Sequence, residues 1–139
     1  MHRFHLSVVA ASRNDDHGEN LHYRMQYFLD GFIAQCKKHN LNAELILVEW
    51  NPPENKLSLS KSLIYPKELG PCEIRIIRVP RELHLQFEHS EQLPLFQMIA
   101  KNVGIRRARG KFVLATNIDI LFTDALIRDL RDKLNPNFF

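Results

Sequence analysis

Residues 101–119 read KNVGIRRARGKFVLATNID, and this stretch decides the expected fold. Its first half has the character of a helix that ends at Arg109, and residues 112–116 form a continuous apolar run of strand length. Such a run is typical of a strand buried on both faces, as in a parallel sheet. Asn117 and Asp119 follow directly, at the expected carboxyl end of that strand, where open α/β sheets bind their ligands.

The rest of the chain alternates between strand-like and helix-like segments. The expected strands are 6–11, 44–50, 73–79 and 112–116, and the expected helices are 21–39, 95–109 and 124–134. Connections are expected at 56–72, without regular structure, and at 80–94, with a single turn of helix as an alternative. The order β-α-β-β-α-β-α predicts one α/β domain over residues 1–139, Rossmann-like, with three α/β/α layers around a mostly parallel sheet.

Individual residues indicate where the helices end and how closely they pack. The helix over 21–39 has an apolar stripe at steps of three and four residues. Asn20 is expected to cap its start and Asn40 to stop it, and Thr123 is expected to cap the last helix. Gly104 lies within a helix, where glycine costs about 1 kcal/mol relative to alanine, so tight packing or a nearby ligand is expected there.

Composition limits the classes of protein to consider. The 139 residues are 45% hydrophobic and 25% charged, which are ordinary values for a globular domain. A net charge of +3 is compatible with an anionic ligand or with peripheral association at an anionic membrane surface, but is too weak to favour nucleic acid. Cys36 and Cys72 form no CxxC motif or disulfide framework, which favours a reducing compartment. The sequence has no stretch of about 20 apolar residues and no signal-like start, so a cytoplasmic location is expected.

Polar side chains follow three of the four expected strands. They are Ser12, Arg13 and Asn14 after the first strand, Glu49 and Asn51 at the end of the second, and Asn117 and Asp119 after the last. Because the carboxyl ends of parallel strands share one edge of a sheet, these side chains are expected to converge on one crevice. A carboxylate such as Glu49 can accept hydrogen bonds from a nucleobase or ribose. Asn117 and Asp119 can hold Mn²⁺ or Mg²⁺, which prefer oxygen ligands and stabilise a diphosphate leaving group.

Each of these signals also has a simpler interpretation. Asn-x-Asp after a strand is a common turn and capping pattern. Glu49 alone is equally well a solvated strand end, and Arg13 and Asn14 are also typical of an exposed loop. The two histidines and two glutamates within residues 82–89 lack tight ligand spacing, so a metal role there is not favoured.

Three segments carry a family resemblance. They are LSVVAASRN (6–14), ILVEWNPP (46–53) and AKNVGIRRARGKFVLATNIDILF (100–122). Together they resemble the nucleotide-binding half of a family 2-type glycosyltransferase with the GT-A fold, whose usual third segment ends in an acidic D-x-D motif. The resemblance runs from about residue 6 to residue 134.

The resemblance implies a domain that binds a nucleotide-diphosphate sugar with Mn²⁺ or Mg²⁺. In a complete protein it implies transfer of the sugar to an acceptor hydroxyl, with an acceptor that these residues do not identify. The nucleotide-binding positions expected from the strand ends and the resemblance are Ser12, Arg13, Asn14, Glu49, Asn51, Lys101, Asn102 and Asn117. The expected metal positions are Asp119 and Asn117.

The sequence departs from the family pattern in three ways. Asn117 stands where the family has the first aspartate of its motif, which removes a charge. Residues 49–51 read EWN instead of the more usual DDG or DDS, so the donor preference is not inherited. The acceptor-binding half with its catalytic base is expected beyond Phe139, and the fragment alone is expected to be inactive in transfer. The face that this half would cover is expected to be apolar and to favour self-association.

Two other functions are consistent with these residues. One is a non-catalytic nucleotide-sugar-binding or regulatory module, which Asn117 and the missing half favour. The other is a nucleotidyltransferase, which also uses strand-end carboxylates and Mg²⁺. That class is disfavoured because its phosphate loop after the first strand is rich in glycine, whereas the first glycine here is Gly18.

Overall fold

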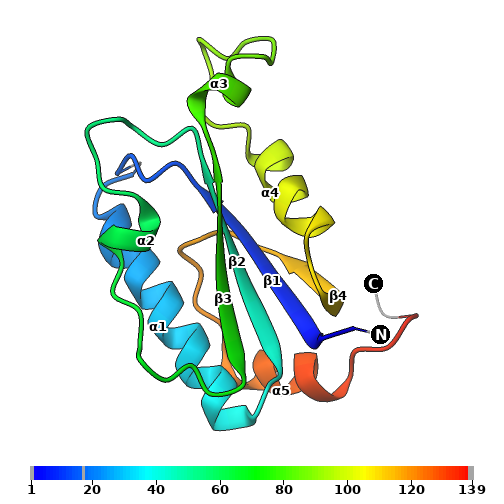
Figure 1. The fold of residues 1–139 in the computed structure, drawn as a ribbon. Coiled ribbons are helices and arrows are strands. Elements are labelled where there is room, and N and C mark those ends of the chain that lie inside the picture. The colour runs from blue at the N-terminus through cyan, green and yellow to red at the C-terminus, as the bar shows by residue number, and fades with distance from the viewer. Residues whose placement is uncertain (1, 17, 138–139) are drawn as a thin grey trace.

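A computed structural model describes residues 2–16 and 18–137 and shows a four-stranded, all-parallel sheet flanked by helices (Figure 1). The elements in chain order are β1 (Phe4–Ser12), α1 (Leu21–His39), β2 (Ala43–Trp50), α2 (Leu59–Ser62), β3 (Cys72–Val79), α3 (Arg81–His84), α4 (Gln97–Arg106), β4 (Gly110–Ala115) and α5 (Asp124–Asp132). The strand order is β3-β2-β1-β4, and every neighbouring pair is parallel. The α/β class and the Rossmann-like architecture expected from the sequence are confirmed.

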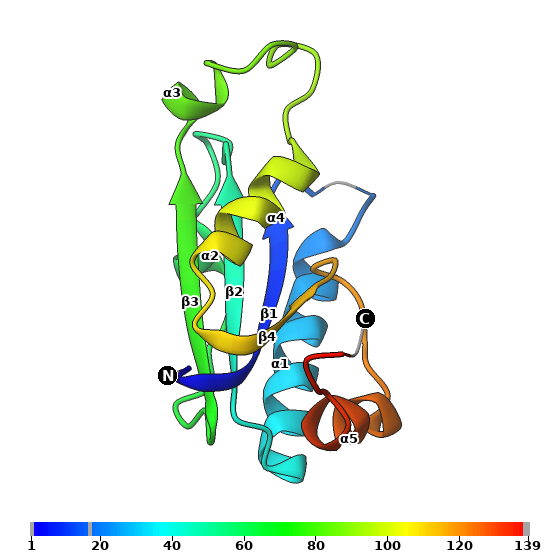
Figure 2. The same cartoon turned by 90° about the vertical axis from the view of Figure 1, so that its right-hand side faces the viewer.

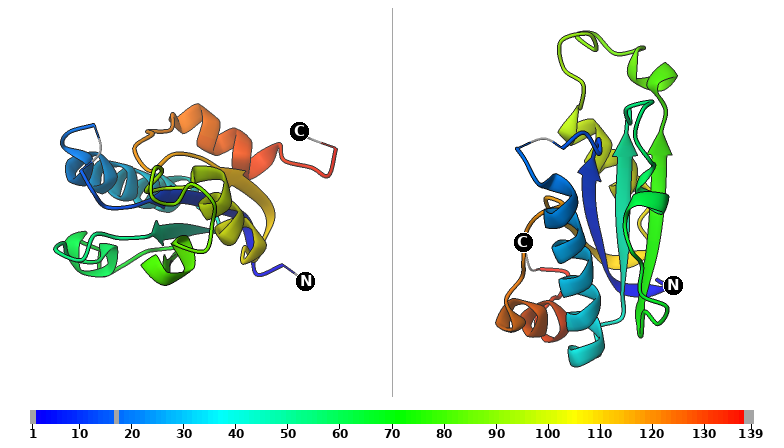
Figure 3. Two further views of the ribbon diagram at one scale, coloured as in Figure 1. Left: turned by 90° about the horizontal axis from the view of Figure 1, so that it is seen from above. Right: turned by 90° about the vertical axis from the view of Figure 1, so that its left-hand side faces the viewer.

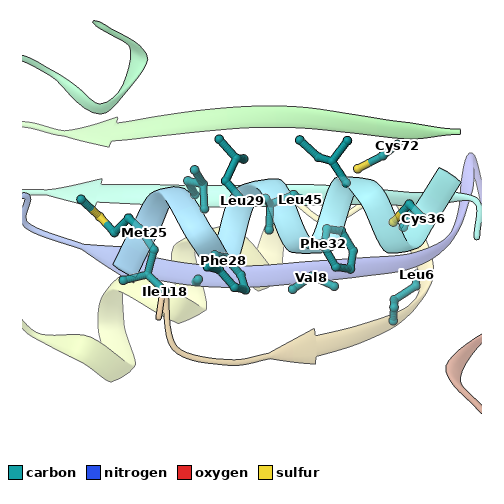
Figure 4. Packing of buried hydrophobic residues seen from close by; sticks show 14 of the residues in the cluster. Leu6, Val8, Met25, Phe28, Leu29, Phe32, Cys36, Leu45, Cys72 and Ile118 are labelled. Carbon is teal, nitrogen blue, oxygen red and sulfur yellow. The ribbon is translucent and has the colours of Figure 1, made fainter. Parts of the chain in front are cut away.

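Helices cover both faces of the sheet and complete three layers. The helices α1 and α5 lie on one face, and α4 lies on the other (Figures 2 and 3). Successive strand side chains point to opposite faces. Accordingly, Val8 and Leu45 pack in the core beneath α1, whereas Val9 and Ile46 pack in the core beneath α4. Figure 4 shows the first of these cores, with Phe28 among the α1 side chains that face the strands.

The last strand is less buried than its apolar sequence predicts. It pairs with β1 at the edge of the sheet. Phe112 and Leu114 pack toward α1, but Val113 on the other face is 43% exposed. The expectation of a strand buried on both faces is therefore wrong for β4, because α4 packs mainly over β1 and β2.

Of the three residues predicted to cap or stop a helix, two are confirmed. Asn40 ends α1 with a left-handed backbone, and the Thr123 side chain accepts a hydrogen bond from the backbone N–H of Leu126. Asn20 does not cap α1 with its side chain, so that prediction is wrong. Its φ of 53° lies outside the extended region from which a capping side chain reaches the first turn. Asp16 substitutes for it, since its Oδ1 accepts the backbone N–H of residue 21 at 2.9 Å.

The connections hold slightly more helix than expected, and one helix is shorter. The connection at 56–72 contains α2, and the turn of helix considered for 80–94 is α3. The helix expected over 95–109 is confined to α4. Within the ranges that the structure describes, no helix has the length and apolar character needed to cross a membrane.

The two cysteines are free thiols buried between α1 and the sheet (Figure 4). A hydrogen bond to Cys72 and burial both raise the pKa of the Cys36 thiol. Because the thiolate is the reactive form, Cys36 is an inert core residue, as its position on the apolar stripe of α1 predicts.

Gly104 lies where α4 packs closely against the sheet, which confirms the tight packing expected from the sequence. A Cβ added there would lie 2.4 Å from Val9 Cγ1 and 3.1 Å from Val48 Cγ2. Gly104→Ala is expected to lower the free energy of unfolding by about 1–3 kcal/mol, because overpacking outweighs the gain in helix propensity.

The matched control is Gly31 in the middle of α1. A Cβ added at Gly31 would make an ordinary contact, 3.7 Å from Leu121 Cδ2. Gly31→Ala is therefore expected to raise the free energy of unfolding by up to about 1 kcal/mol. Urea denaturation measures both variants, and effects of the same sign would contradict this account of Gly104.

Candidate functional site

A cavity of about 280 Å³ opens at the carboxyl end of β1. It is lined by Ala11, Ser12, Arg13, Asp15, Leu21, Pro94, Leu95, Gln97 and Ile118. In the sheet, β2 and β3 lie on one side of β1 and β4 lies on the other. The cavity is thus at the point where the strand order reverses, which is where open α/β sheets bind ligands.

The loop after β1 forms one wall of this cavity and is held by its own polar side chains. Ser12 Oγ accepts the backbone N–H of Asn14 at 3.0 Å. Arg13 Nε donates to the backbone oxygen of Asn51 at 2.8 Å, and its Nη1 lies 3.4 Å from Asp15 Oδ2. These contacts hold Ser12, Arg13 and Asp15 at the cavity. Asp15 was not singled out by the sequence, since nothing in its spacing distinguishes it from other loop acids.

Asn14 lies behind this wall. It is buried with φ of 60°, and its Nδ2 donates to the backbone oxygen of Leu57 at 2.7 Å. Its side chain therefore ties the loop to the connection after β2. Asn14 lines a separate cavity of about 520 Å³ between the start of α1 and residues 56–62, which also has Lys56 and Lys61 in its wall. Of the residues predicted for the site, this second cavity contains only Asn14 among its lining residues.

Glu49 is buried at the end of β2 and makes a structural hydrogen bond. It is only 1% exposed, which makes the interpretation as a solvated strand end wrong. Its Oε2 accepts the backbone N–H of Leu59 at 2.7 Å, so the carboxylate holds the start of α2. Burial, and secondarily the charge of Glu49, raise the pKa of nearby Tyr65 to about 12. Glu49 does not line the 280 Å³ cavity, and a role in reading the base stays a prediction.

Asn51 joins β2 to the segment that reaches the cavity. Its backbone N–H donates to the oxygen of Val79 at 2.8 Å, and its Nδ2 donates to the oxygen of Pro94 at 2.9 Å. Pro94 is itself a cavity residue. The Asn51 Oδ1 is buried and has no hydrogen-bond partner among the described residues. Asn51 thus positions the cavity wall from a buried place behind it.

The segment after β4 places Asn117 and Asp119 on either side of Ile118, which lines the cavity. We name these two side chains and the two cations bonded to them, Lys101 and Arg24, the rim of the cavity. Residues 118–119 form a turn, as the simpler interpretation predicted, with Ile118 lining the cavity. The neighbouring side chains bond to cations, however. Lys101 Nζ donates to Asn117 Oδ1 at 2.9 Å, and the Arg24 guanidinium donates to the Asp119 carboxylate.

All but one of the predicted residues therefore fall into three groups. Ser12 and Arg13 line the cavity; Lys101, Asn117 and Asp119 lie at its rim; Asn14, Glu49 and Asn51 are buried behind its walls. Asn102 is exposed on α4 and does not line the cavity. Arg24 was not identified from the sequence, because it is 95 positions from its partner and has no local motif around it.

The side chains after β4 do not fit a divalent cation. Among the described residues, no cluster of three or more His, Cys, Asp or Glu could hold a metal ion. Asp119 is a single carboxylate and is already paired with Arg24, and the Asn117 oxygen is bonded to Lys101. Mg²⁺ and similar hard cations need several oxygen ligands, and one here would have to displace two side-chain cations. The Mn²⁺ or Mg²⁺ expected from the sequence stays a prediction that this arrangement does not favour.

The segment 82–89, considered as a loose metal cluster, has a different role. His84 is buried, with its Nδ1 bonded to Trp50 Nε1 at 2.9 Å and its Nε2 to the Ser90 oxygen at 2.9 Å. Both ring nitrogens are therefore used in structural bonds.

Comparison with known proteins does not assign this chain to a family. No protein-family model matches the chain, and no curated protein matches it. The interpretation of the site therefore rests on the cavity at the end of β1 and on the residues around it.

Proposed function

We propose that this chain binds a nucleotide-diphosphate sugar in the cavity at the carboxyl end of β1. The observation that carries the proposal is the position of the cavity at the reversal of strand order, where nucleotides bind in doubly wound α/β sheets. Three cationic side chains, Arg13, Arg24 and Lys101, lie in its wall or at its rim. A diphosphate is the ligand group that such cations favour.

The size of the cavity suits part of such a ligand. Its volume of about 280 Å³ is near the lower end of small-molecule sites, which begin at about 300 Å³. Leu21, Leu95 and Ile118 supply apolar surface for a nucleoside. The diphosphate would then extend toward the cations at the rim.

Sugar transfer is the reaction that the sequence resemblance supports for a protein with an acceptor-binding half. An acceptor hydroxyl would attack the anomeric carbon, the bond from that carbon to the diphosphate would break, and the nucleoside diphosphate would leave. Cations at the rim would stabilise the charge that develops on the leaving diphosphate. The catalytic base and the acceptor are not assigned to any residue described here.

A non-catalytic nucleotide-sugar-binding module is the second candidate. The observation that favours it is the pairing of Asp119 with Arg24, together with an asparagine at position 117. A site with these side chains can still bind a polar ligand. It has no pair of aspartates to bind a metal ion, as the D-x-D motif of family 2-type glycosyltransferases does. Both candidates require nucleotide binding in the same cavity.

Nucleotide binding is expected to stabilise the fold. A nucleoside diphosphate at about 100 times its dissociation constant should add about 2.7 kcal/mol to the free energy of unfolding. Thermal denaturation in the presence of UDP, GDP, ADP, CDP or dTDP measures this effect as a rise in Tm.

A matched pair of variants tests whether the rise comes from this cavity. Arg13→Gln, in the cavity wall, is expected to reduce the rise, whereas Arg128→Gln, exposed on α5, is expected to leave it unchanged. A folded protein whose Tm responds to none of the five nucleotides would contradict the proposed function.

A further inference from the structure

Two side-chain cations from opposite faces of the sheet meet at the turn that follows β4. Arg24 belongs to α1 and Lys101 belongs to α4. The Arg24 guanidinium bonds to the Asp119 carboxylate, and Lys101 Nζ lies 2.9 Å from Asn117 Oδ1. These two oxygen-bearing side chains are the ones that the sequence assigned to a metal ion.

Both cations lie beside the nucleotide cavity. Leu21 and Gln97 line it from the first turns of α1 and α4. Arg24 follows Leu21 by three positions and Lys101 follows Gln97 by four, so each cation is one helical turn from a lining residue on the same helix face. A diphosphate that extends from the cavity over Ile118 would approach Asn117 and Asp119, the two side chains to which these cations are bonded.

The ion pair at this rim is accessible to a ligand. The Arg24 and Asp119 side chains are 35% and 30% exposed. The Arg24 Nε and Nη2 donate to the backbone oxygen of Glu19, and its Nη1 donates to Asp119. Partly exposed ion pairs contribute little to stability, so Nη1 can exchange the carboxylate for a phosphate oxygen at small cost. A guanidinium binds phosphate oxygens through charge-assisted hydrogen bonds, and the lysine ammonium binds them as a point charge.

We propose that Arg24 and Lys101 bind the diphosphate directly and take the place of a divalent cation. This inference rests on the proposed nucleotide site. A dication at Asn117 and Asp119 would be repelled by both side-chain cations, whereas a diphosphate is attracted by both. Asp119 and Asn117 are then positioning residues, which hold the two cations at the rim before the nucleotide arrives.

Calorimetric titration of the folded chain with the nucleoside diphosphates UDP, GDP, ADP, CDP and dTDP, in EDTA and in MnCl₂, tests the inference. The dissociation constant of a nucleotide that binds is expected to be the same in both buffers. Arg24→Gln and Lys101→Gln should each weaken binding about tenfold or more in EDTA, the effect of losing a charge-assisted hydrogen bond. Affinity for the matching nucleoside, which lacks phosphates, should not change in these variants. Arg128→Gln, which removes an exposed cation on α5, should leave both affinities unchanged.

The variant Asp119→Asn separates a positioning residue from a metal ligand. It is expected to keep nucleotide binding in EDTA, because the positive charges of Arg24 and Lys101 are retained. Binding that requires Mn²⁺ and is lost in Asp119→Asn would overturn this inference and leave the proposed nucleotide site standing. Failure of every nucleotide to bind in either buffer, with a native circular dichroism spectrum, would instead overturn the proposed function.

Discussion

Glu44→Ala is expected to lower the free energy of unfolding by about 3–5 kcal/mol, the usual cost of removing one partner of a buried ion pair. Glu44 in β2 is 0% exposed. Its Oε1 accepts hydrogen bonds from Ser7 Oγ and from the backbone N–H of Arg109, both at 2.6 Å, and its Oε2 accepts from Arg75 Nε at 3.0 Å. One carboxylate thus joins β1, β2, β3 and the start of β4. Its removal leaves a guanidinium and a backbone donor without their buried acceptor.

A carboxylate on the neighbouring strand provides the control. Glu73 in β3 has a side chain that is 34% exposed, and it pairs with Arg3 and Arg109 at the surface. Glu73→Ala is expected to cost about 0–1 kcal/mol, because solvent screens such pairs. Urea denaturation with a common m-value measures both variants. Equal losses would show that burial does not distinguish the two carboxylates.

Trp50→Ala is also expected to lower the free energy of unfolding by about 3–5 kcal/mol, as for other large-to-small substitutions of buried aromatic residues. The Trp50 side chain is buried at the end of β2, and its Nε1 donates to His84 Nδ1 at 2.9 Å. Because Nδ1 accepts this bond, the Nε2 of His84 carries the proton and donates to the oxygen of Ser90. The rings of Phe87 and Phe96 pack around the indole, with centroids 5.8 Å and 6.3 Å away. The substitution therefore removes packing and also leaves a buried histidine nitrogen without its donor.

Trp50→Phe separates these two losses. It retains an aromatic ring in the cluster and removes the N–H, so a loss of about 1–3 kcal/mol is expected from the unsatisfied nitrogen of His84. The same cluster holds the segment that brings Pro94 and Leu95 to the cavity, so Trp50→Ala should also weaken nucleotide binding. Urea denaturation and calorimetry measure the two effects. Identical losses of stability in both variants would show that packing of the indole contributes nothing beyond its hydrogen bond.

The sequence predicted those parts of the fold that depend on local patterns. The apolar stripe of residues 21–39 determines a helix with one buried face, and α1 buries that face against the sheet. The apolar runs at 6–11 and 44–50 require cover on both faces, and helices provide it for β1 and β2. Position along the chain was also sufficient to place Ser12 and Arg13 at the carboxyl end of β1, where the cavity lies.

Local sequence patterns could not predict how much of the surface of each helix or strand would be buried by neighbouring elements. The apolar run at 112–116 resembles that of a central strand, yet β4 is at the sheet edge. One of its faces is partly exposed because α4 packs mainly over β1 and β2. Asn20 has the right residue type for a cap, but its backbone is left-handed and Asp16 takes that role. Glu49 lies at a strand end, where a carboxylate could bind a ligand. Its Oε2 instead accepts the backbone N–H of Leu59 at the start of α2.

The sequence by itself determined the α/β class, the faces of the helices and the edge of the sheet where the cavity lies, because these follow from short-range periodicity and element order. Tertiary structure alone decided which charges meet at that edge. Arg24 and Asp119 are 95 positions apart and are joined by the packing of α1 beside the turn after β4. No local spacing encodes such a contact, and it changes the expected partner of Asp119 from a metal ion to a guanidinium.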